Sequence, residues 1–185
     1  MDTLAPGHYW KTPFIWERGC AEPVAASALR YEPATKAWLR EAIGAAMAQS
    51  LDESDQYTVD KIGIDRAVEE VFEVSQRYFE YRPGWWQAAV DASGERVGFV
   101  LTTVFADPSR WKEGRPQGTI LYMGVLPGFR GNGYALDLIL EATRQCIEAN
   151  CWRVFCDTGS SNHPMVGAFR KAGYGERAAW QRPLA

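Results

Sequence analysis

Apolar positions along this chain follow two spacings, and each predicts one kind of element. In some stretches they recur at three- and four-residue steps, which is typical of a helix with one buried face. In others they run on without interruption, which is typical of a buried strand. The predicted helices begin at Ala34, span about 60–81 and 133–149, and follow Pro164. The predicted strands cover 25–31, 85–90, 96–106, 120–126, 153–157 and 176–182.

Prolines, glycines and polar clusters predict where these elements end. Residues 51–56 form the polar exit of the first helix, and Arg82-Pro83-Gly84 ends the second. The polar turn at 91–95 joins its two neighbouring strands into a hairpin. Residues 1–22 are expected to be an irregular arm, with a short strand near 12–16 and aromatic residues that attach it to the core. Residues 23–185 are expected to form a single domain.

The composition narrows the class of protein. The chain has 185 residues, of which 46% are apolar and 23% charged, so it can bury a sizeable globular core. Its net charge of -3 gives no basic excess, which argues against nucleic acid as a partner. No stretch approaches the ~20 apolar residues of a membrane helix. The first stretch, MDTLAPGHYW, lacks the basic and apolar regions of a secretory signal. We therefore expect a cytoplasmic protein.

The cysteines and histidines do not predict a metal site. The chain contains 4 Cys and 2 His, without a Cys-x-x-Cys pair. Neither His8 nor His163 has the spacing of a metal ligand. We expect reduced, structural cysteines and no metal.

The most informative stretch is LYMGVLPGFRGNGYALDLIL, residues 121–140. A buried strand is stopped by Pro127 and Gly128, and a glycine-rich turn then opens a helix. The N–H groups of a first helical turn have no intrahelical partner, and the helix dipole favours negative charge there. Glycines allow a phosphate to approach the main chain, and Arg130 adds a positive charge. These features predict a phosphate-binding turn.

The turn lacks the hallmarks of two common phosphate-binding motifs. A Walker A loop would end in Gly-Lys-Ser/Thr, which is absent, and a dinucleotide fingerprint would place a third glycine where Leu136 stands. Instead, Arg130, Gly133 and Ala135 fit the Arg/Gln-x-x-Gly-x-Gly/Ala signature, preceded by Val125-Leu126-Pro127. Downstream, Asn162 and the ending Ala168-Phe169-Arg170-Lys171-Ala172-Gly173-Tyr174 follow in the expected order. Over roughly 85–174 the chain thus resembles the GNAT superfamily of acetyl-CoA-dependent N-acetyltransferases.

This resemblance implies a fold. The GNAT fold is an α+β (α/β) architecture, with a central mixed, mostly antiparallel twisted sheet of about six or seven strands and about four flanking helices. The strand before the glycine turn splays from its neighbour, and Gly124 is compatible with a bulge there. Family members often carry a further strand beyond the one predicted at 176–182. In this chain, that further strand would be short, absent or replaced by the N-terminal arm. Dimers are common in the family, so a homodimer is one expected assembly.

The resemblance also implies a function. Family members move an acetyl group from acetyl-CoA directly to an amine, here a primary amine of a small molecule or peptide. The residues that match the cofactor-binding positions are Met123, Val125, Arg130, Gly131, Asn132, Gly133, Tyr134, Ala135, Asn162 and Phe169. Asn162 is equally suited to cap the following helix.

The acid and base of the family pattern are missing. The Tyr that protonates the thiolate in many members is replaced by Phe169, and the Glu that often acts as base is replaced by Leu121. Asp157 and His163 are the nearest titratable alternatives, although Asp157 could equally cap a loop. Two further functions therefore stay open, namely a non-catalytic acyl-CoA-binding module that senses its ligand and a transferase of longer acyl groups.

Overall fold

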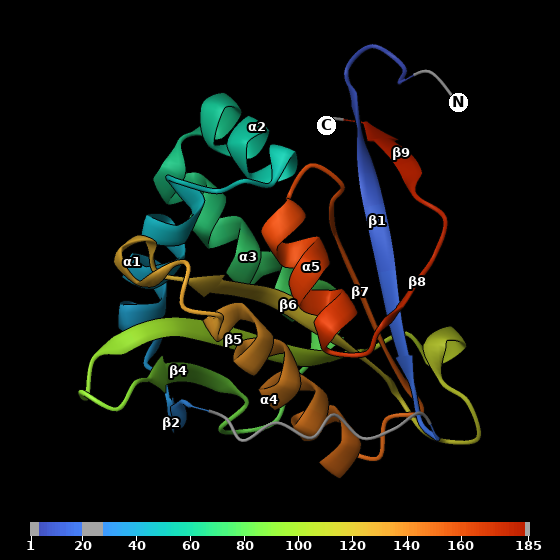
Figure 1. Ribbon diagram of the computed structural model, residues 1–185. Coiled ribbons are helices and arrows are strands. Elements are labelled where there is room, and N and C mark those ends of the chain that lie inside the picture. The colour runs from blue at the N-terminus through green and yellow to red at the C-terminus, as the bar shows by residue number, and fades with distance from the viewer. Residues whose placement is uncertain (1–3, 20–27, 184–185) are drawn as a thin grey trace.

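The computed structural model describes residues 4–19 and 28–183. Their strands form one open sheet in the order β2-β4-β5-β6-β7-β1-β8, with β3 paired to β5 and β9 paired to β1 (Figure 1). The strands are β1 (His8–Glu17), β2 (Arg30–Pro33), β3 (Phe79–Glu80), β4 (Trp86–Val90), β5 (Arg96–Phe105), β6 (Gln117–Val125), β7 (Arg153–Gly159), β8 (Gly175–Glu176) and β9 (Trp180–Pro183). Only the β6–β7 pair is parallel among these, so the predicted mixed, mostly antiparallel sheet is confirmed.

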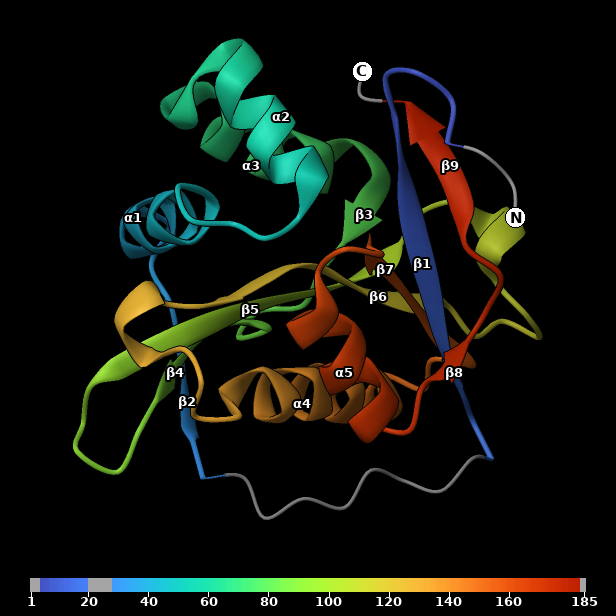
Figure 2. The ribbon, with the colours of Figure 1, turned by 45° about the horizontal axis from the view of Figure 1, so that its top comes forward.

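Helices cover both faces of the sheet. They are α1 (Lys36–Met47), α2 (Glu53–Ile62), α3 (Ile64–Tyr78), α4 (Tyr134–Glu148) and α5 (His163–Lys171). The α1–α3 group and α4 lie on opposite sides of β5 and β6 (Figure 2). Side chains of β5 alternate accordingly: Phe99 and Leu101 belong to the core under α1 and α3, whereas Val100 packs with Leu138 of α4.

The region between the first strands and the hairpin differs from the prediction. Residues 51–56, expected to be a polar exit, instead start α2, because the Asp52 side chain accepts a hydrogen bond from the N–H of Ser54 at 3.0 Å and caps this helix. The helix expected over 60–81 is broken at Gly63, whose φ of 80° ends α2 before α3 begins. The described part of the chain therefore has five α-helices, where about four were expected.

The N-terminal segment is a full strand of the sheet. β1 extends well beyond the predicted 12–16 and pairs antiparallel with β7, from Lys11 opposite Gly159 to Glu17 opposite Arg153. The N-terminal segment thus takes the place beside β7, which was one of the three alternatives for the further strand of the family. The strand predicted at 176–182 is split into β8 and β9, and both pair with β1. The predicted strand at 25–31 lies partly outside the described residues, as does the predicted boundary between residues 22 and 23.

The two central parallel strands separate after a short contact. β6 and β7 pair only at Gln117 with Arg153 and Gly118 with Val154. Beyond these pairs, β6 continues to Val125 and β7 to Gly159 without pairing to each other, so the predicted splay is present. The bulge in β6 lies at Leu121, between the Tyr122–Leu101 and Ile120–Thr102 pairs, and not at Gly124 as expected. The sheet is therefore open directly in front of the glycine turn.

Candidate active site

The glycine turn places free main-chain donors at the start of α4. Gly131 and Gly133 have φ values of 87° and 83°, and Gly133 is the N-cap without a side-chain cap. No described residue accepts a hydrogen bond from the N–H groups of Gly131, Asn132 or Gly133. A Cβ atom added at either glycine would meet nothing within 4 Å. Outward-facing donors beside open space at a helix N-terminus suit an anion, and we call residues 131–135 the main-chain cradle.

Arg130 contacts the main chain of the protein itself. Its guanidinium donates to the main-chain oxygens of Val125 (3.3 Å), Gln49 (2.7 Å) and Ala46 (3.3 Å). Ala46 is in the last turn of α1, where carbonyl groups lack helical partners. The side chain therefore fastens the turn to the C-terminal end of α1. The guanidinium thus contacts carbonyl oxygens of the protein. From the sequence, we expected its positive charge to contact the phosphate of a ligand.

The other predicted cofactor residues of this region surround the opening between β6 and β7. Met123 and Val125 lie on β6 past its last pair with β7 and are partly buried. Asn132 donates through Nδ2 to the Phe129 carbonyl at 3.0 Å, which shapes the turn. Tyr134 and Ala135 form the first turn of α4 and pack against the two core clusters.

Gly124 allows α1 to approach this part of β6. A Cβ atom at position 124 would lie 3.0 Å from the Ala46 Cβ and 3.2 Å from the Phe99 ring. A side chain there would push α1 away from the strand. The glycine therefore permits close helix–strand packing, and it brings the end of α1 to the cradle, where Arg130 holds it.

Asn162 and Phe169 both have structural partners. The Asn162 Oδ1 accepts a hydrogen bond from the Met165 N–H at 3.4 Å and caps α5, as the alternative interpretation predicted. Its Nδ2 donates to the Thr158 hydroxyl at 3.4 Å. Phe169 is only 3% exposed and stacks on Phe14, with ring centroids 4.8 Å apart. Phe169 is thus a core residue, and its side chain carries no group that could transfer a proton.

The two predicted acid–base residues have unequal surroundings. His163 is exposed at the start of α5. Asp157 lies on β7, and its Oδ1 is 3.0 Å from the Lys11 Nζ, with 20% of the Asp157 side chain exposed. Asp157 is therefore one member of a buried ion pair. The Asp157 carboxylate is thus already paired with Lys11, whereas the exposed His163 side chain forms no ion pair with a described residue.

Lys11 is the centre of a buried polar cluster, which sequence reasoning missed. Its Nζ lies between Asp157 and the Oδ2 of Asp52, the latter at 3.8 Å. Burial alone would lower the pKa of Lys11, but the two carboxylates outweigh it and hold that pKa above its usual range. Asp52 also accepts from the N–H of Gly159 at 2.6 Å. Burial alone would raise the pKa of Asp52, but Lys11 and these hydrogen bonds outweigh it and lower that pKa. The cluster joins β1, β7 and α2.

A second polar contact links α2 to β6. The Tyr122 hydroxyl donates to the Asp55 Oδ2 at 2.7 Å, and the Ser50 hydroxyl donates to the same oxygen at 2.7 Å. Burial raises the pKa of Asp55 despite both hydrogen bonds. Burial, together with the neighbouring Asp55, also raises the pKa of Tyr122 well above its usual range. Asp55 lies three residues after Asp52, the N-cap of α2, in the stretch predicted to be a polar exit. This spacing is the sequence signal that could have indicated a helix start and a role for Asp55.

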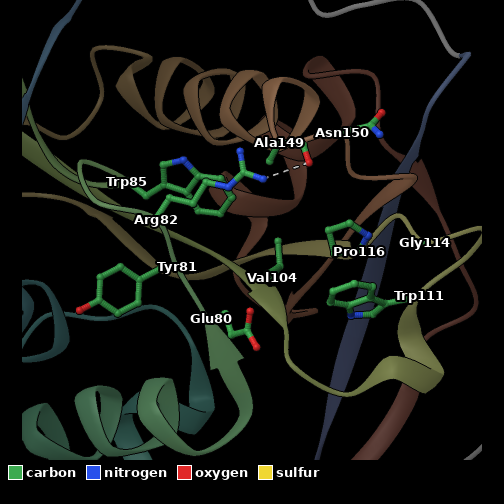
Figure 3. A pocket seen from close by; sticks show the side chains of 10 residues that line it. All are labelled: Glu80, Tyr81, Arg82, Trp85, Val104, Trp111, Gly114, Pro116, Ala149 and Asn150. Carbon is green, nitrogen blue, oxygen red and sulfur yellow. Dashed lines mark hydrogen bonds between the residues drawn. The ribbon is translucent and has the colours of Figure 1, made fainter.

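The cavity in Figure 3 is separate from the cradle. It has a volume of about 420 Å³. It is lined by Glu80, Tyr81, Arg82, Trp85, Val104, Trp111, Gly114, Pro116, Ala149 and Asn150. Arg82 points toward the Ala149 carbonyl, 3.5 Å away, at the C-terminal end of α4. Carbonyl groups make that end of a helix unfavourable for phosphate, so the cradle at the opposite end of α4 is the better site for an anionic ligand.

The described residues include no group of three or more His, Cys, Asp and Glu side chains placed to hold a metal ion. Cys146, Cys151 and Cys156 are buried and have free thiols. Within the described ranges, no helix has the length and apolar character needed to span a membrane.

An open splay between two parallel strands, beside a main-chain cradle, is an arrangement that suits a phosphate-bearing ligand. The family model of the acetyltransferase (GNAT) family matches residues 45–174. This match spans most of the chain, so the protein belongs to the GNAT acetyltransferase family, as the glycine-turn signature predicted. The family uses acetyl-CoA as acetyl donor.

Individual relatives agree with the family but are distant. The mycothiol acetyltransferase of Saccharomonospora viridis is 31% identical over 109 residues, which are 56% of this chain and 35% of that protein. The chain thus spans about a third of the length of this curated relative.

Solved structures show the same fold. A GCN5-related N-acetyltransferase from Sphaerobacter thermophilus has a TM-score of 0.55 at 16% identity, covering 95% of this chain and 52% of that one. A phosphinothricin acetyltransferase from Sinorhizobium meliloti, solved in complex with AcCoA, has a TM-score of 0.55 at 16% identity. The match covers 85% of this chain and 89% of that one. These likenesses confirm the predicted fold class.

Proposed function

We propose that this protein transfers an acetyl group from acetyl-CoA directly to a primary amine of a small molecule or peptide. The observation that carries the proposal is the main-chain cradle at residues 131–135, facing the unpaired lengths of β6 and β7. The N–H groups of Gly131, Asn132 and Gly133 would hold the pyrophosphate, because they are preoriented donors at a helix N-terminus. Family membership supports acetyl-CoA as the donor.

The residues around the splay suit the rest of the ligand. After Gly118, the edge of β6 that faces β7 has no strand partner among the described residues, and this length of β6 includes Met123 and Val125. Free strand edges bind extended ligands through main-chain hydrogen bonds. An extended pantetheine arm would therefore lie along β6, with its thioester near Met123 and its acceptor amine approaching from the α1–α3 side. Asn162 and its neighbours on α5 would border the same opening.

The first test is a calorimetric titration of the purified protein with acetyl-CoA, with CoA alone as control. A panel of amines follows, with thiol release as the readout, and includes an amino acid analogue such as phosphinothricin, an amino sugar, an arylalkylamine and a dipeptide. Micromolar binding with turnover of at least one amine supports the proposal. Binding without turnover would instead support an acyl-CoA-binding module. Preferential turnover of longer acyl-CoAs would support a transferase that uses a longer acyl donor.

Gly133→Glu should weaken acetyl-CoA binding by a hundredfold or more. The new carboxylate would enter the open space of the cradle and repel phosphate, since a like charge at short range costs several kcal/mol when partly desolvated. Gly94→Glu is the matched control, because Gly94 also has a positive φ, 91°, and open space, but lies in the β4–β5 hairpin turn. An affinity within about twofold of wild type for Gly133→Glu would overturn the cradle as the binding site.

A further inference from the structure

The positions that carry acid and base in many relatives are inert in this chain, yet a polar pair lies next to one of them. Leu121 and Phe169 have no titratable group, whereas Tyr122 directly follows Leu121 on β6. Tyr122 is opposite Leu101 in the β5–β6 ladder, so it points to the sheet face that α1 and α3 cover. It also lies on the part of β6 that has separated from β7.

The Tyr122 hydroxyl is fixed rather than free to rotate away. Its hydrogen bond to Asp55 is 2.7 Å long, and its ring stacks on Phe99 with centroids 6.0 Å apart. Asp55 is fixed in turn by the Ser50 hydroxyl. Both donors use the same oxygen, Oδ2, so this carboxylate has a defined orientation toward the phenol.

In the described part of the chain, the charged groups with the largest effects on this pair lie on β1, at the start of α2 and in the glycine turn. Asp52 of α2 and Lys11 of β1 act on Asp55, while Asp52 and Arg130 act on Tyr122. Lys11 is itself paired with Asp157 of β7. Burial keeps the pKa of Asp55 above that of an ordinary aspartate, closer to neutral pH, which favours its use as a proton acceptor.

We propose that Tyr122 and Asp55 form the proton relay of the transfer reaction, with Tyr122 as the catalytic residue and Asp55 as the positioning residue behind it. This inference rests on the proposed function. The pair joins β6, at the splay, to α2, on the side from which the acceptor would approach. It supplies the proton transfer that Leu121 and Phe169 cannot provide.

The relay balances over one cycle. The amine nitrogen bonds to the carbonyl carbon of the thioester, the C–S bond breaks, and its electron pair leaves with sulfur. The Tyr122 oxygen takes one proton from that nitrogen while the phenolic proton passes to the Asp55 Oδ2. Asp55 then returns the proton through Tyr122 to the thiolate, so that free CoA leaves and both side chains regain their initial state.

The activity test compares Tyr122→Phe and Asp55→Asn with wild type, using the best amine of the panel. We expect kcat/KM to fall about a hundredfold or more in Tyr122→Phe, while the calorimetric Kd for acetyl-CoA stays within about twofold. Asp55→Asn should also remove the acidic inflection of the kcat/KM–pH profile. Tyr57→Phe and Asp60→Asn, on the same helix, are the matched controls; Asp60 is exposed, and the Tyr57 hydroxyl accepts a hydrogen bond from the Lys61 Nζ at the surface.

A measurement on the free protein needs no turnover. In protein labelled with ¹³C-aspartate, the carboxyl signal lost in Asp55→Asn should titrate above the range of exposed aspartates. Tyr122→Phe should move its midpoint further up, since it removes a hydrogen bond to the ionised carboxylate. A midpoint that does not respond to Tyr122→Phe overturns the relay.

The outcomes separate the two proposals. If wild-type protein acetylates amines and both variants are equally fast, the relay is wrong and the transferase function stands. If wild-type protein binds acetyl-CoA but acetylates no amine, the transferase function fails and the relay fails with it.

Discussion

The cradle follows the separated end of β6, and the Lys11 cluster includes Asp157 on the separated length of β7, but the two are built in opposite ways. The cradle uses main-chain donors from the contiguous residues 131–135. Its glycines have no side chain, which leaves open space beside these donors. The cluster uses side chains from β1, α2 and β7, and Lys11 is the buried cation that holds Asp52 and Asp157 together. A main-chain site of this kind is built from residues that are contiguous in sequence. A side-chain site depends on the whole fold.

The largest expected effect is on stability, and it comes from Lys11→Met, which disrupts the Lys11 cluster. Removal of the buried cation would leave two carboxylates without their charge partner, which typically costs about 3–5 kcal/mol. Urea unfolding of the variant at neutral pH measures this loss. Lys36→Met, at an exposed position of α1, is the matched control and should change the free energy of unfolding by less than about 0.5 kcal/mol. A loss below about 1 kcal/mol for Lys11→Met would show that the cluster is not held by charge.

Asp52→Asn should have the next largest effect, about 2 kcal/mol at pH 7. Asp52 caps α2 through Oδ1 and accepts from the Gly159 N–H through Oδ2. Its folded-state pKa is below the unfolded value of about 3.9. Ionised Asp52 therefore stabilises the protein fully above about pH 4, and this stabilisation disappears as pH falls through the lower, folded pKa.

The gap between wild type and Asp52→Asn should accordingly narrow toward acidic pH. Denaturant unfolding at a series of pH values from 7 down to about 3 measures it. Arg130→Ala is the comparator from the cradle, because Arg130 donates to main-chain carbonyl oxygens and has no carboxylate partner among these contacts. A gap for Asp52→Asn that is constant over the series would mean that Asp52 acts as a neutral cap.

The same contrast explains what the sequence could predict. The strand, the glycine turn and α4 follow each other directly along the chain, so hydrophobic periodicity and the motif are enough to locate the cradle. The splay also followed from the family resemblance. Tyr122 and Asp55, by comparison, are 67 positions apart, and no local pattern joins them.

Errors in the prediction trace to polar residues with partners distant in sequence. Residues 51–56 contain few apolar positions, and α2 has no fully buried residue, so hydrophobic periodicity gives no signal for this helix. Its start depends on the Asp52 cap, and Asp52 is held in turn by Lys11 and by β7. Gly124 is compatible with a bulge because glycine is common in bulges, but in the structure it accommodates the close approach of α1 and the bulge lies at Leu121.

The smallest expected change in stability concerns Arg130, the side chain that braces the cradle. Arg130→Ala removes hydrogen bonds to the carbonyls of Ala46, Gln49 and Val125 at an exposed position, so it should cost only about 1 kcal/mol. Acetyl-CoA affinity should nevertheless fall severalfold, because the turn loses its attachment to α1. Arg130→Lys distinguishes a brace from a charge: it keeps the charge but cannot reach three divergent carbonyls with a planar fork. We expect calorimetry to show that lysine fails to restore affinity. Full restoration would mean that Arg130 acts on the phosphates through its charge after all.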